Sequence, residues 1–384
     1  MNDERGGKRV YVGMSGGVDS SVTAALLKEQ GYDVVGVHIK MWSDPSIPCN
    51  FKEDRYDAMC AAEKIGIPFQ TWDLTEEYRT AVVEYMIREY AAGRTPNPDV
   101  MCNRHVKFGV FLKRALEAGA DFVATGHYVK KRESRKLNVE GGKKIPASMQ
   151  DSLPHATLHS LHAAFDSQKD QSYFLWTLTQ DQLRYVLFPI GEYTKPEVRE
   201  MARKFSLPTA EKKDSQGICF IGEIDLNAFL KKHIPMRPGL IVTTAGRIVG
   251  EHDGLAFYTI GQRAGMGIGG GIPYYVAAKD AAANTLVVSE GPYDEKLFSN
   301  ELTAGDINWI SGKAPGFPFE CEARIRYRQP LQECRVWSLE SGGDGHSPQS
   351  TLHVRFADSQ RAVTPGQSIV FYSGEEMLGG GVIV

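Results

Sequence analysis

Apolar residues are spaced in two different ways along this chain, and the change comes shortly after residue 220. In the first part, short and nearly continuous apolar runs alternate with longer segments of helical spacing. The runs are 9–12, 34–39, 69–74 and 121–126, and the helical segments are 21–30, 54–65, 75–92, about 106–118, 179–187 and 196–205. Continuous apolar runs are typical of parallel strands that are buried on both faces. This order predicts an α/β fold, a doubly wound parallel sheet that binds ligands at the carboxyl ends of its strands.

Beyond residue 234 the apolar runs become shorter, and Gly and Pro become more frequent. The short runs are 240–243, 247–250, 274–277, 285–288, 320–327, 334–339, 351–356 and 368–371. This pattern predicts short strands joined by tight turns, which form first a small β-rich central domain and then a C-terminal β-barrel. We place the domains at 1–228, 229–297 and 298–384. The polar segment 130–153 interrupts the α/β pattern, and we expect a mobile insertion there.

Composition and charge limit the kinds of protein that this chain can be. Its 384 residues, of which 42% are hydrophobic, suggest two or three domains with a large core. The net charge of -3 argues against a protein that coats nucleic acid, so a polyanionic partner must meet local basic patches. The six cysteines include no C-x-x-C pair and no zinc-type spacing, so we expect no metal site and a reduced cytoplasmic setting. No run of about 18 apolar residues predicts a membrane span, and the short polar segment 1–8 does not resemble a signal peptide.

The clearest candidate site is the run G-M-S-G-G-V-D-S-S at residues 13–21. It joins a short strand to the start of a helix, where small residues let backbone amides approach a phosphate. Ser15, Ser20 and Ser21 could add hydroxyl donors. The run lacks the lysine of a Walker loop and resembles the pyrophosphate loop of the ATP-pyrophosphatase superfamily, whose members split ATP into AMP and pyrophosphate. The alternative is a glycine turn before an ordinary helix.

Cys102 is a candidate nucleophile. Two prolines precede it, and the predicted helix begins just after it, with three cations close in sequence: Arg104, His105 and Lys107. A helix N-terminus and nearby cations lower the pKa of a thiol. Asp99 lies three residues earlier and could act as a general acid or base. The alternative is a small buried hydrophobic residue, because free cysteines are often buried.

Cys219 is a second candidate, because Lys212 and Lys213 precede it and Gly217 allows close approach of the backbone. It could equally be a cysteine within a buried strand. The two cysteines are 219 − 102 = 117 positions apart, so the sequence does not show that they meet. We interpret the other four cysteines as structural: Cys49, Cys60, Cys321 and Cys334.

Three polar segments are candidates for binding a nucleotide or RNA. The first, 125–128, follows a predicted central strand, where Gly126 would let a nucleotide lie close; the second, 169–173, precedes an aromatic segment. The third has arginines at alternate positions, which places the side chains on one face of a strand and suggests contact with a phosphate backbone: Arg324, Arg326 and Arg328. The alternatives are a packed strand end, a solvated helix cap and a solvated sheet face.

Taken together, these motifs resemble those of the bacterial-type tRNA-specific 2-thiouridylases, which are tRNA-uridine 2-sulfurtransferases with an adenine nucleotide alpha-hydrolase-like fold. The resemblance extends from about Arg9 to Gly381. Its motifs are G-M-S-G-G-V-D-S-S at 13–21, G-R-T-P-N-P-D-x-x-C at 93–102, A-T-G-H-Y at 124–128, K-D-Q-S-Y-F at 169–174, D-S-x-G-I-C-F-I-G-E at 214–223, R-Y-R-Q at 326–329 and T-P-G-Q at 364–367. The segment 130–153 is longer than is usual in the family, which affects the tRNA contacts expected of that loop.

The resemblance implies a role for each matching residue. Cys102 would be the nucleophile, Cys219 the persulfide carrier, and Asp99 a catalytic acid or base. ATP would contact Gly13, Met14, Ser15, Gly16, Gly17, Val18, Asp19, Ser20, Ile39 and Gly126, with Mg²⁺ accompanying it and no dedicated metal site. The target base would contact Asn97, Pro98 and Asp99, and the rest of the tRNA would contact His127, Lys169, Asp170, Gln171, Arg326, Tyr327 and Gln367.

The resemblance also implies a reaction and its partners. ATP would adenylate the C2 oxygen of the wobble uridine (U34), and sulfur from a cysteine persulfide would replace that oxygen. Cys102 would attack the persulfide and form a disulfide with Cys219, or it would assist at the adenylated base. The partners would be a tRNA anticodon stem-loop and a protein that donates persulfide sulfur, without a membrane. Two alternatives remain. One is a ligase or amidotransferase that acts on a small metabolite, and the other is a tRNA-binding or sulfur-relay protein without catalysis.

Overall fold

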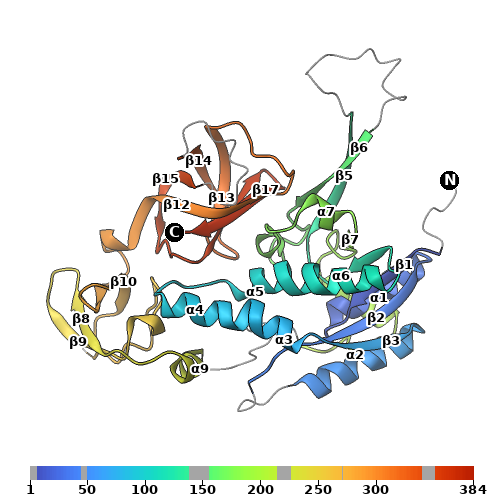
Figure 1. Ribbon diagram of the computed structural model, residues 1–384, viewed down its shortest axis with the longest axis horizontal. Helices are drawn as coiled ribbons and strands as arrows, with labels where there is room; N and C mark the ends of the chain where they lie inside the picture. Colours follow the sequence, from blue (N-terminus) through green and yellow to red (C-terminus); the bar gives the residue numbers. More distant parts are fainter. Residues whose placement is uncertain (1–6, 45–49, 138–154, 214–225, 270, 340–350) are drawn as a thin grey trace.

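The computed structural model describes residues 7–44, 50–137, 155–213, 226–269, 271–339 and 351–384 (Figure 1). Within these residues, the N-terminal part is built on a parallel sheet in the order β3-β2-β1-β4-β7. Its strands are β1 (Arg9–Gly13), β2 (Asp33–Lys40), β3 (Phe69–Asp73), β4 (Phe122–Ala124) and β7 (Val186–Leu187). The order places β1 at the centre, so the segments that follow β1, β2 and β4 share one edge of the sheet.

Alternating side chains on the strands bind helices to both faces of this sheet. Val10 and Val12 of β1 pack with α1 (Val18–Glu29) and α2 (Phe51–Ile65). Tyr11 faces the other way, into a core shared with two long helices, each interrupted by a π-helical stretch. One consists of α3 (Thr75–Tyr78), η1 (Arg79–Glu84) and α4 (Tyr85–Ala91), and the other of α5 (Pro98–Met101), η2 (Cys102–Phe111) and α6 (Leu112–Glu117). The predicted doubly wound sheet is thereby confirmed.

Two shorter helices complete this part of the chain, and a third leads into the next. Helix α7 (Gln180–Leu183) precedes β7, and α8 (Lys195–Lys204) packs against α1 through Val198 and Ala202. Each begins with a capping box, built on Thr179 and Thr194 respectively. Helix α9 (Leu226–His233) buries Phe229 and Leu230 in the core that surrounds the two long helices.

The central β-rich part is a four-stranded sheet in the order β10-β11-β8-β9. Its strands are β8 (Gly239–Thr243), β9 (Ile248–His252), β10 (Tyr274–Asp280) and β11 (Thr285–Glu290), and the short 3₁₀ helix η5 (Leu255–Phe257) follows β9. The buried side chains of this sheet continue the core of the α/β part, because Val276 and Val288 belong to the same packed cluster. The central sheet is therefore joined to the long helices by apolar contacts.

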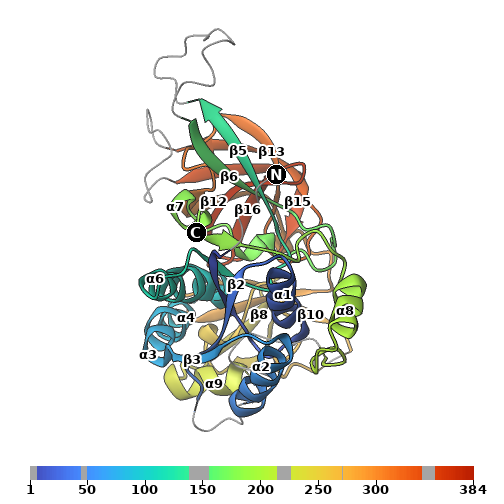
Figure 2. The ribbon, with the colours of Figure 1, turned by 90° about the vertical axis from the view of Figure 1, so that its right-hand side faces the viewer.

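The C-terminal part is a barrel in which six described strands close through a β12–β17 pairing. The strands are β12 (Phe298–Trp309), β13 (Phe319–Arg324), β14 (Gln332–Ser338), β15 (Leu352–Arg361), β16 (Ser368–Ser373) and β17 (Glu376–Ile383). A separate apolar cluster that includes Trp309 and Phe371 fills its interior. Figures 1 and 2 both show the barrel above the α/β part. A C-terminal β-barrel was predicted, and the structure confirms it.

The start of the segment predicted to be a mobile insertion is ordered. Strand β5 (Lys130–Leu137) pairs along its whole length with β6 (His155–His162), and β6 pairs with β17 of the barrel. The polar composition was misleading because a two-stranded ribbon can expose both faces, and the cross-strand backbone bonds still satisfy its amides. The expectation of a mobile insertion is wrong for 130–137, and residues 138–153 lie outside the part that is described.

Candidate functional site

The loop between β1 and α1 lies at the carboxyl edge of the parallel sheet, and we call residues 13–21 the pyrophosphate loop. The amide of Met14 donates to the carbonyl of Val37 at 2.8 Å, which ties the loop to β2. Gly16 has a φ of +84°, and a Cβ atom there would lie 2.3 Å from the carbonyl oxygen of Asp54 on α2. Only glycine fits this conformation and this contact. The loop is therefore fixed between the sheet and α2.

Gly126 follows β4 and packs against the backbone at the start of α1. A Cβ atom at this position would lie 2.8 Å from the amide nitrogen of Ser20 and 2.9 Å from the carbonyl carbon of Asp19. The missing side chain thus makes room for the pyrophosphate loop itself. Ile39 is half-buried near the end of β2, on the other side of β1. Three neighbouring strands bring these residues to one edge, while their contacts with ATP stay predictions.

All three serines expected to offer hydroxyl donors have hydrogen-bond partners inside the loop. The hydroxyls of Ser20 and Ser21 donate to the carbonyl of Gly17 at 3.1 and 2.9 Å, and both residues are buried. The tight turn uses these groups to satisfy its own backbone, and contact of the two hydroxyls with a ligand stays a prediction. Ser15 is exposed, but its hydroxyl accepts from the amide of Gly17 at 3.3 Å and lies 3.3 Å from the hydroxyl of Ser20.

The start of α1 is suited to an anion. Its N-cap is Gly17, which offers no side chain to the amides of the first turn. Such amides are the usual ligands of phosphate at a helix N-terminus, and the helix dipole favours negative charge there. Val18 and Ser20 are buried in this turn, so the backbone rather than the side chains would make the contact.

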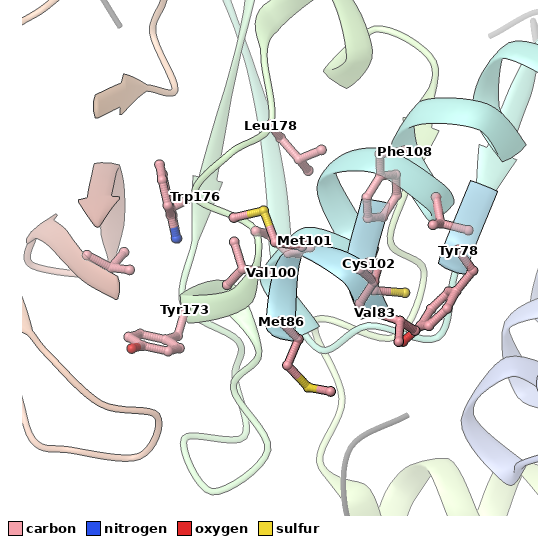
Figure 3. Packing of buried hydrophobic residues seen from close by; sticks show 14 of the residues in the cluster. Tyr78, Val83, Met86, Val100, Met101, Cys102, Phe108, Tyr173, Trp176 and Leu178 are labelled. Carbon is pink, nitrogen blue, oxygen red and sulfur yellow. The ribbon is translucent and has the colours of Figure 1, made fainter. Parts of the chain in front are cut away.

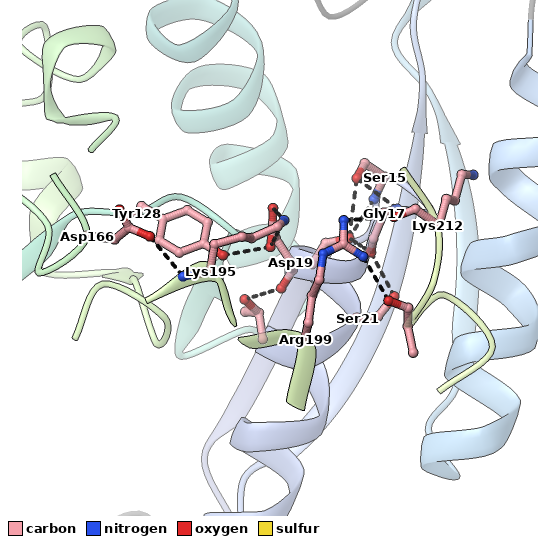
Figure 4. A network of polar contacts seen from close by, with 12 residues as sticks. Ser15, Gly17, Asp19, Ser21, Tyr128, Asp166, Lys195, Arg199 and Lys212 are labelled. Carbon is pink, nitrogen blue, oxygen red and sulfur yellow. Dashed lines mark hydrogen bonds and ion pairs between the residues drawn. The ribbon is translucent and has the colours of Figure 1, made fainter. Parts of the chain in front are cut away.

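Asp19, in the same turn, is held by two residues from other parts of the chain. The ammonium group of Lys195 donates to both carboxylate oxygens, at 2.7 and 2.8 Å, and the hydroxyl of Tyr128 donates to one of them at 2.8 Å (Figure 4). Lys195 is only 8% exposed. The helix that begins beside Lys195 can be predicted from the sequence, but the pairing of this lysine with Asp19 cannot, because the two residues are 176 positions apart.

Two further cations lie on α8 and on the segment that follows it, Arg199 and Lys212 respectively. The Lys212 ammonium donates to Asp54 at 2.7 Å and also contacts Asp57, which links this segment to α2. Arg199 donates to the backbone carbonyls of Ala210 and Lys212, at 2.8 and 3.1 Å, and so fixes the position of the segment (Figure 4). The pyrophosphate loop is therefore bordered by basic groups in a chain whose net charge is negative.

Cys102 lies inside a helix and not before one. The helix begins at Pro98, and the side chain of its N-cap, Asn97, accepts a hydrogen bond from the amide of Val100 at 3.3 Å. Cys102 is 1% exposed and belongs to the large apolar core, where Figure 3 shows it beside Tyr78. The prediction that this thiol precedes the helix is wrong, because proline at the first helical position starts a helix rather than delaying it.

Asp99 and Cys102 are nevertheless well placed relative to each other. They are separated by three positions in one helix, so their side chains lie on the same side of it. Asp99 is half-buried, whereas Cys102 is covered. Asp99 is thus nearer to solvent than Cys102, and its role as a general acid or base stays a prediction.

The remaining cysteines divide into described and undescribed ones. Cys219 and Cys49 lie outside the described residues, so the meeting of Cys102 with Cys219 stays a prediction. Cys321 and Cys334 face each other across β13 and β14, with their sulfur atoms 3.6 Å apart. Contact with Cys334 and burial raise the pKa of the Cys321 thiol. A raised pKa disfavours the reactive thiolate, which agrees with the interpretation of this pair as structural.

Sequence comparisons agree with this arrangement. The family described as tRNA methyl transferase HUP domain matches residues 8–223, the tRNA methyl transferase PRC-barrel domain matches 227–290, and the aminomethyltransferase beta-barrel domain matches 299–383. A tRNA-specific 2-thiouridylase MnmA of Streptococcus pyogenes serotype M1 is 48% identical over 98% of this chain and 95% of its own length. The chain belongs to the tRNA-specific 2-thiouridylase family. A second relative of that name, from S. pyogenes serotype M4, is 47% identical over the same shares.

Among solved structures, the chain is similar to the U34-tRNA thiolase NcsA from Methanococcus maripaludis. The two are 18% identical, and the match covers 61% of this chain and 70% of that one with a TM-score of 0.34, which is too low to carry an argument. Within the described residues, no three His, Cys, Asp or Glu side chains form a cluster suited to a metal ion. In the same part of the chain, no helix is both long enough and apolar enough to cross a membrane.

Several residues that the 2-thiouridylase resemblance assigns to tRNA lie inside the protein. His127 packs against Phe108 and Phe188, and its Nδ1 lies 2.7 Å from the hydroxyl of Thr125. Burial, with a smaller effect of Lys107, lowers the pKa of His127 well below its usual range. The imidazole is therefore neutral in the folded chain, and a charged contact with phosphate is not available to it.

Asp170 and Gln171 also make internal bonds. Asp170 is 3% exposed, and its carboxylate accepts from the amides of Ala164 and Ser172 at 3.1 Å and from the Ser172 hydroxyl at 3.0 Å. The side-chain oxygen of Gln171 accepts from the amide of Tyr128 at 3.0 Å. These bonds join the 169–173 segment to the strand end beside the pyrophosphate loop. Lys169 and Gln171 are both half-exposed, and contact of this segment with tRNA stays a prediction.

The three arginines do not form one stripe on a strand. Strand β13 ends at Arg324, which donates to Asp170 at 3.3 Å, and the chain then turns. Arg326 donates to the carbonyl of Ala362 at 2.8 Å, and Arg328 is exposed with a φ of +63°. The prediction of a common face is wrong, because a left-handed residue at position 328 breaks the alternation that a strand requires.

Tyr327 and Gln367 complete the set of residues assigned to tRNA. The Tyr327 ring packs against Phe174 in a tilted arrangement, with ring centroids 4.5 Å apart, and Tyr327 remains half-exposed. Gln367 donates from its amide nitrogen to the carbonyls of Thr95 and Pro96, at 2.9 and 3.0 Å. Tyr327 thus presents part of an aromatic face outward, whereas Gln367 binds the protein's own backbone just before Asn97.

Proposed function

We propose that this chain is an ATP-dependent tRNA-uridine 2-sulfurtransferase that converts the wobble uridine of tRNA to 2-thiouridine, with release of AMP and pyrophosphate. The observation that supports this most strongly is 48% identity over 98% of the chain with a tRNA-specific 2-thiouridylase, in a chain that keeps the pyrophosphate loop. We further propose tRNA as the substrate and a protein that carries a persulfide as the sulfur donor.

The nucleotide would bind at the start of α1. Backbone amides of the first turn, which have no cap from Gly17, would hold the phosphates, and the nearby Lys195 and Lys212 would balance their charge. A magnesium ion would be held mainly through the phosphate oxygens, because both carboxylate oxygens of Asp19 are already bound by Lys195. A magnesium ion bound there would supply charge neutralisation for the departing pyrophosphate.

The reaction requires a good leaving group on uracil, because the C2 oxygen alone leaves poorly. Transfer of AMP to this oxygen supplies the leaving group. We propose that Asn97, Pro98 and Asp99 hold the base, with Asp99 moving the proton, since it lies in the first turn of the helix that carries Cys102. The uridine must be unpaired and turned out of its stack to enter the site.

The sulfur would reach the base through two cysteines. Cys219 takes sulfane sulfur from the donor and holds it as a persulfide. The Cys102 thiolate then attacks the inner sulfur of that persulfide, which forms a Cys102–Cys219 disulfide and releases hydrosulfide; the hydrosulfide displaces AMP from C2. A thiol reductant must reduce the disulfide before the next cycle. Because Cys102 is 1% exposed, this step requires a local movement of the core residues around it, so that the thiol can reach the persulfide.

The experiment that separates this proposal from its alternatives measures what AMP and pyrophosphate release depends on. Release that requires tRNA supports the sulfurtransferase. Release that requires a small acid and ammonia would support a ligase or amidotransferase. Retention of tRNA on a filter without nucleotide turnover would support a binding or relay protein. Serine variants of Cys102 and Cys219 should keep ATP binding and lose thiolation when a persulfide donor supplies the sulfur.

A further inference from the structure

The segment Gly93–Pro96 of the α/β part is bound by both the barrel and the central β-rich part. It lies directly before the helix that carries Asp99 and Cys102. From the barrel, the carbonyl of Pro365 accepts a hydrogen bond from the Thr95 amide at 2.8 Å. From the central β-rich part, the ammonium group of Lys279 on β10 donates to the carbonyl of Gly93 at 2.9 Å, and the hydroxyl of Thr259, which lies between η5 and β10, is 3.2 Å from that of Thr95. We call residues 93–96 the clamp segment.

Gln367 makes the most specific of these contacts. Its side-chain nitrogen donates to two successive carbonyls, those of Thr95 and Pro96. A carboxamide has two N–H donors, so both are used inside the protein and only its oxygen is left for another partner. The backbone of Gln367 is itself fixed in the barrel, since its carbonyl accepts from the amide of Ile383 at 2.8 Å. The residue is therefore a rigid link between the barrel and the clamp segment.

The turn that presents Gln367 is shaped to fit this contact. Gly366 has a φ of +91°, and a Cβ atom there would lie 2.8 Å from the Thr95 carbonyl oxygen and 3.0 Å from the Thr95 amide nitrogen. A residue with a side chain would separate the barrel from the clamp segment. The two backbones are thus in direct contact at this point, and the contact depends on the absence of a side chain at Gly366.

The position of the clamp segment fixes the start of the helix that carries Asp99 and Cys102. Pro96 and Pro98 restrict the backbone on either side of Asn97, and Asn97 caps the helix by accepting from Val100. Asp99 follows within the first turn. A shift of the 95–96 peptide therefore moves the carboxylate of Asp99 with it, and a misplacement of about 1 Å can cost about a hundredfold in rate.

We propose that Gln367 is a positioning residue, which aligns Asp99 and Cys102 by holding the clamp segment. Thr259, from the central β-rich part, would help to hold the same segment. This inference rests on the proposed sulfurtransferase function. It differs from the tRNA contact that the family resemblance implies for Gln367, because the amide donors of Gln367 are used on Thr95 and Pro96. RNA bound across the barrel and the central sheet would then also act on the alignment of Asp99.

The test compares tRNA affinity with the single-turnover rate of thiolation at saturating tRNA and ATP, in the full chain. In Gln367→Ala we expect the rate to fall about tenfold or more, from two lost hydrogen bonds, while the tRNA Kd stays within about twofold. Thr259→Val, which removes a hydroxyl at constant size, should lower the rate less, again without a change in Kd. Gln332→Ala is the matched control, because this barrel glutamine donates to the nearby carbonyls of Pro330 and Leu331 and should behave as wild type.

Other outcomes contradict the inference. A tRNA Kd raised tenfold in Gln367→Ala, with a normal rate at saturation, would make this residue an RNA contact. A wild-type thiolation rate and a wild-type tRNA Kd in both Gln367→Ala and Thr259→Val would show that neither side chain is required to position the clamp segment. If Gln367→Ala does not fold, Thr259→Val carries the test. Failure of wild-type protein to thiolate tRNA would instead contradict the proposed function, so the two failures are distinguishable.

Discussion

The ammonium nitrogen of Lys195 lies 2.7 and 2.8 Å from the two carboxylate oxygens of Asp19, although the residues are 176 positions apart. Asp19 lies in the first turn of α1, where phosphate is expected, and Lys195 begins α8. An uncompensated carboxylate would repel phosphate at this point. Lys195 therefore makes the start of α1 usable for an anion and joins α8 to the pyrophosphate loop.

Replacement of Lys195 by methionine should weaken the use of ATP. Methionine keeps much of the apolar stem but leaves Asp19 without its cation, so we expect the KM for ATP to rise about tenfold or more, from the loss of about 1.5–3 kcal/mol. Lys204→Met, at an exposed position of the same helix, is the control and should leave the KM unchanged. Equal KM values in both variants would show that the Lys195–Asp19 pair has no part in nucleotide binding.

Replacement of Gly126 by alanine should disturb the pyrophosphate loop. The added methyl group would lie 2.8 Å from the Ser20 amide nitrogen, so the start of α1 must shift. We expect a loss of about 1–3 kcal/mol in the free energy of unfolding and a loss of measurable ATP binding. Calorimetric titration with ATP, beside denaturant unfolding, measures both. Gly316→Ala, where the added atom meets open space, should match wild type, and undiminished ATP binding in Gly126→Ala would contradict the proposed position of the phosphates.

The buried His127 should make the protein sensitive to acid. Its pKa is lowered in the folded chain by burial, so below about pH 6.5 the unfolded chain binds the proton more readily than the folded chain does. This contribution to stability is present above that pH and is lost as the pH falls. We expect the free energy of unfolding of wild type to decrease relative to His127→Gln, by at most about 1.4 kcal/mol per pH unit. His233→Gln, at an exposed position, should keep the wild-type slope; an equal slope in His127→Gln would contradict this explanation.

Arg324 and Arg328 should respond differently to replacement by methionine. The Arg324 side chain is 11% exposed and pairs with Asp170, whose side chain is 3% exposed, so its loss leaves a buried carboxylate without its cation. We expect Arg324→Met to lower the free energy of unfolding by about 2–4 kcal/mol. Arg328→Met, at an exposed turn, should change it by less than about 1 kcal/mol. If both variants instead keep wild-type stability and lose tRNA affinity equally, the two arginines act as one RNA-binding stripe after all.

Four of the five described strands of the parallel sheet could be predicted from the sequence because each lies in an apolar run of its own. The fifth, β7 (Val186–Leu187), lies in the segment 179–187 that was predicted to be helical, so that prediction is wrong beyond α7 (Gln180–Leu183). The start of the helix that carries Cys102 was missed although its signals are local, since Asn97 and Pro98 are a usual cap and first residue. The two prolines were interpreted as an extended entry, which placed the helix start near residue 106 instead of Pro98. The error moved Cys102 from the interior of a helix to its end and changed the expected surroundings of its thiol.

Other features could not be predicted because they depend on contacts between distant residues. The strand β17 contains Gly379, Gly380 and Gly381, which are unusual in strands, and the structure requires small residues there because Ile307 and Trp176 lie against them. The Lys195–Asp19 pair and the contacts of Gln367 join parts of the chain that no local pattern connects. The turn at Arg328 could not be predicted for another reason, because arginine rarely adopts a positive φ and so does not indicate a turn.

Mass spectrometry of tRNA nucleosides tests the central claim most directly. The protein is incubated with ATP, Mg²⁺, unmodified tRNA and a protein persulfide donor, beside Cys102→Ser and Cys219→Ser variants. We predict that wild type replaces one oxygen of the wobble uridine with sulfur and forms AMP in equal amount, whereas both variants bind ATP and yield no thiolated nucleoside. An unmodified uridine with wild-type protein, or normal thiolation by either variant, would contradict sulfur transfer through these two cysteines.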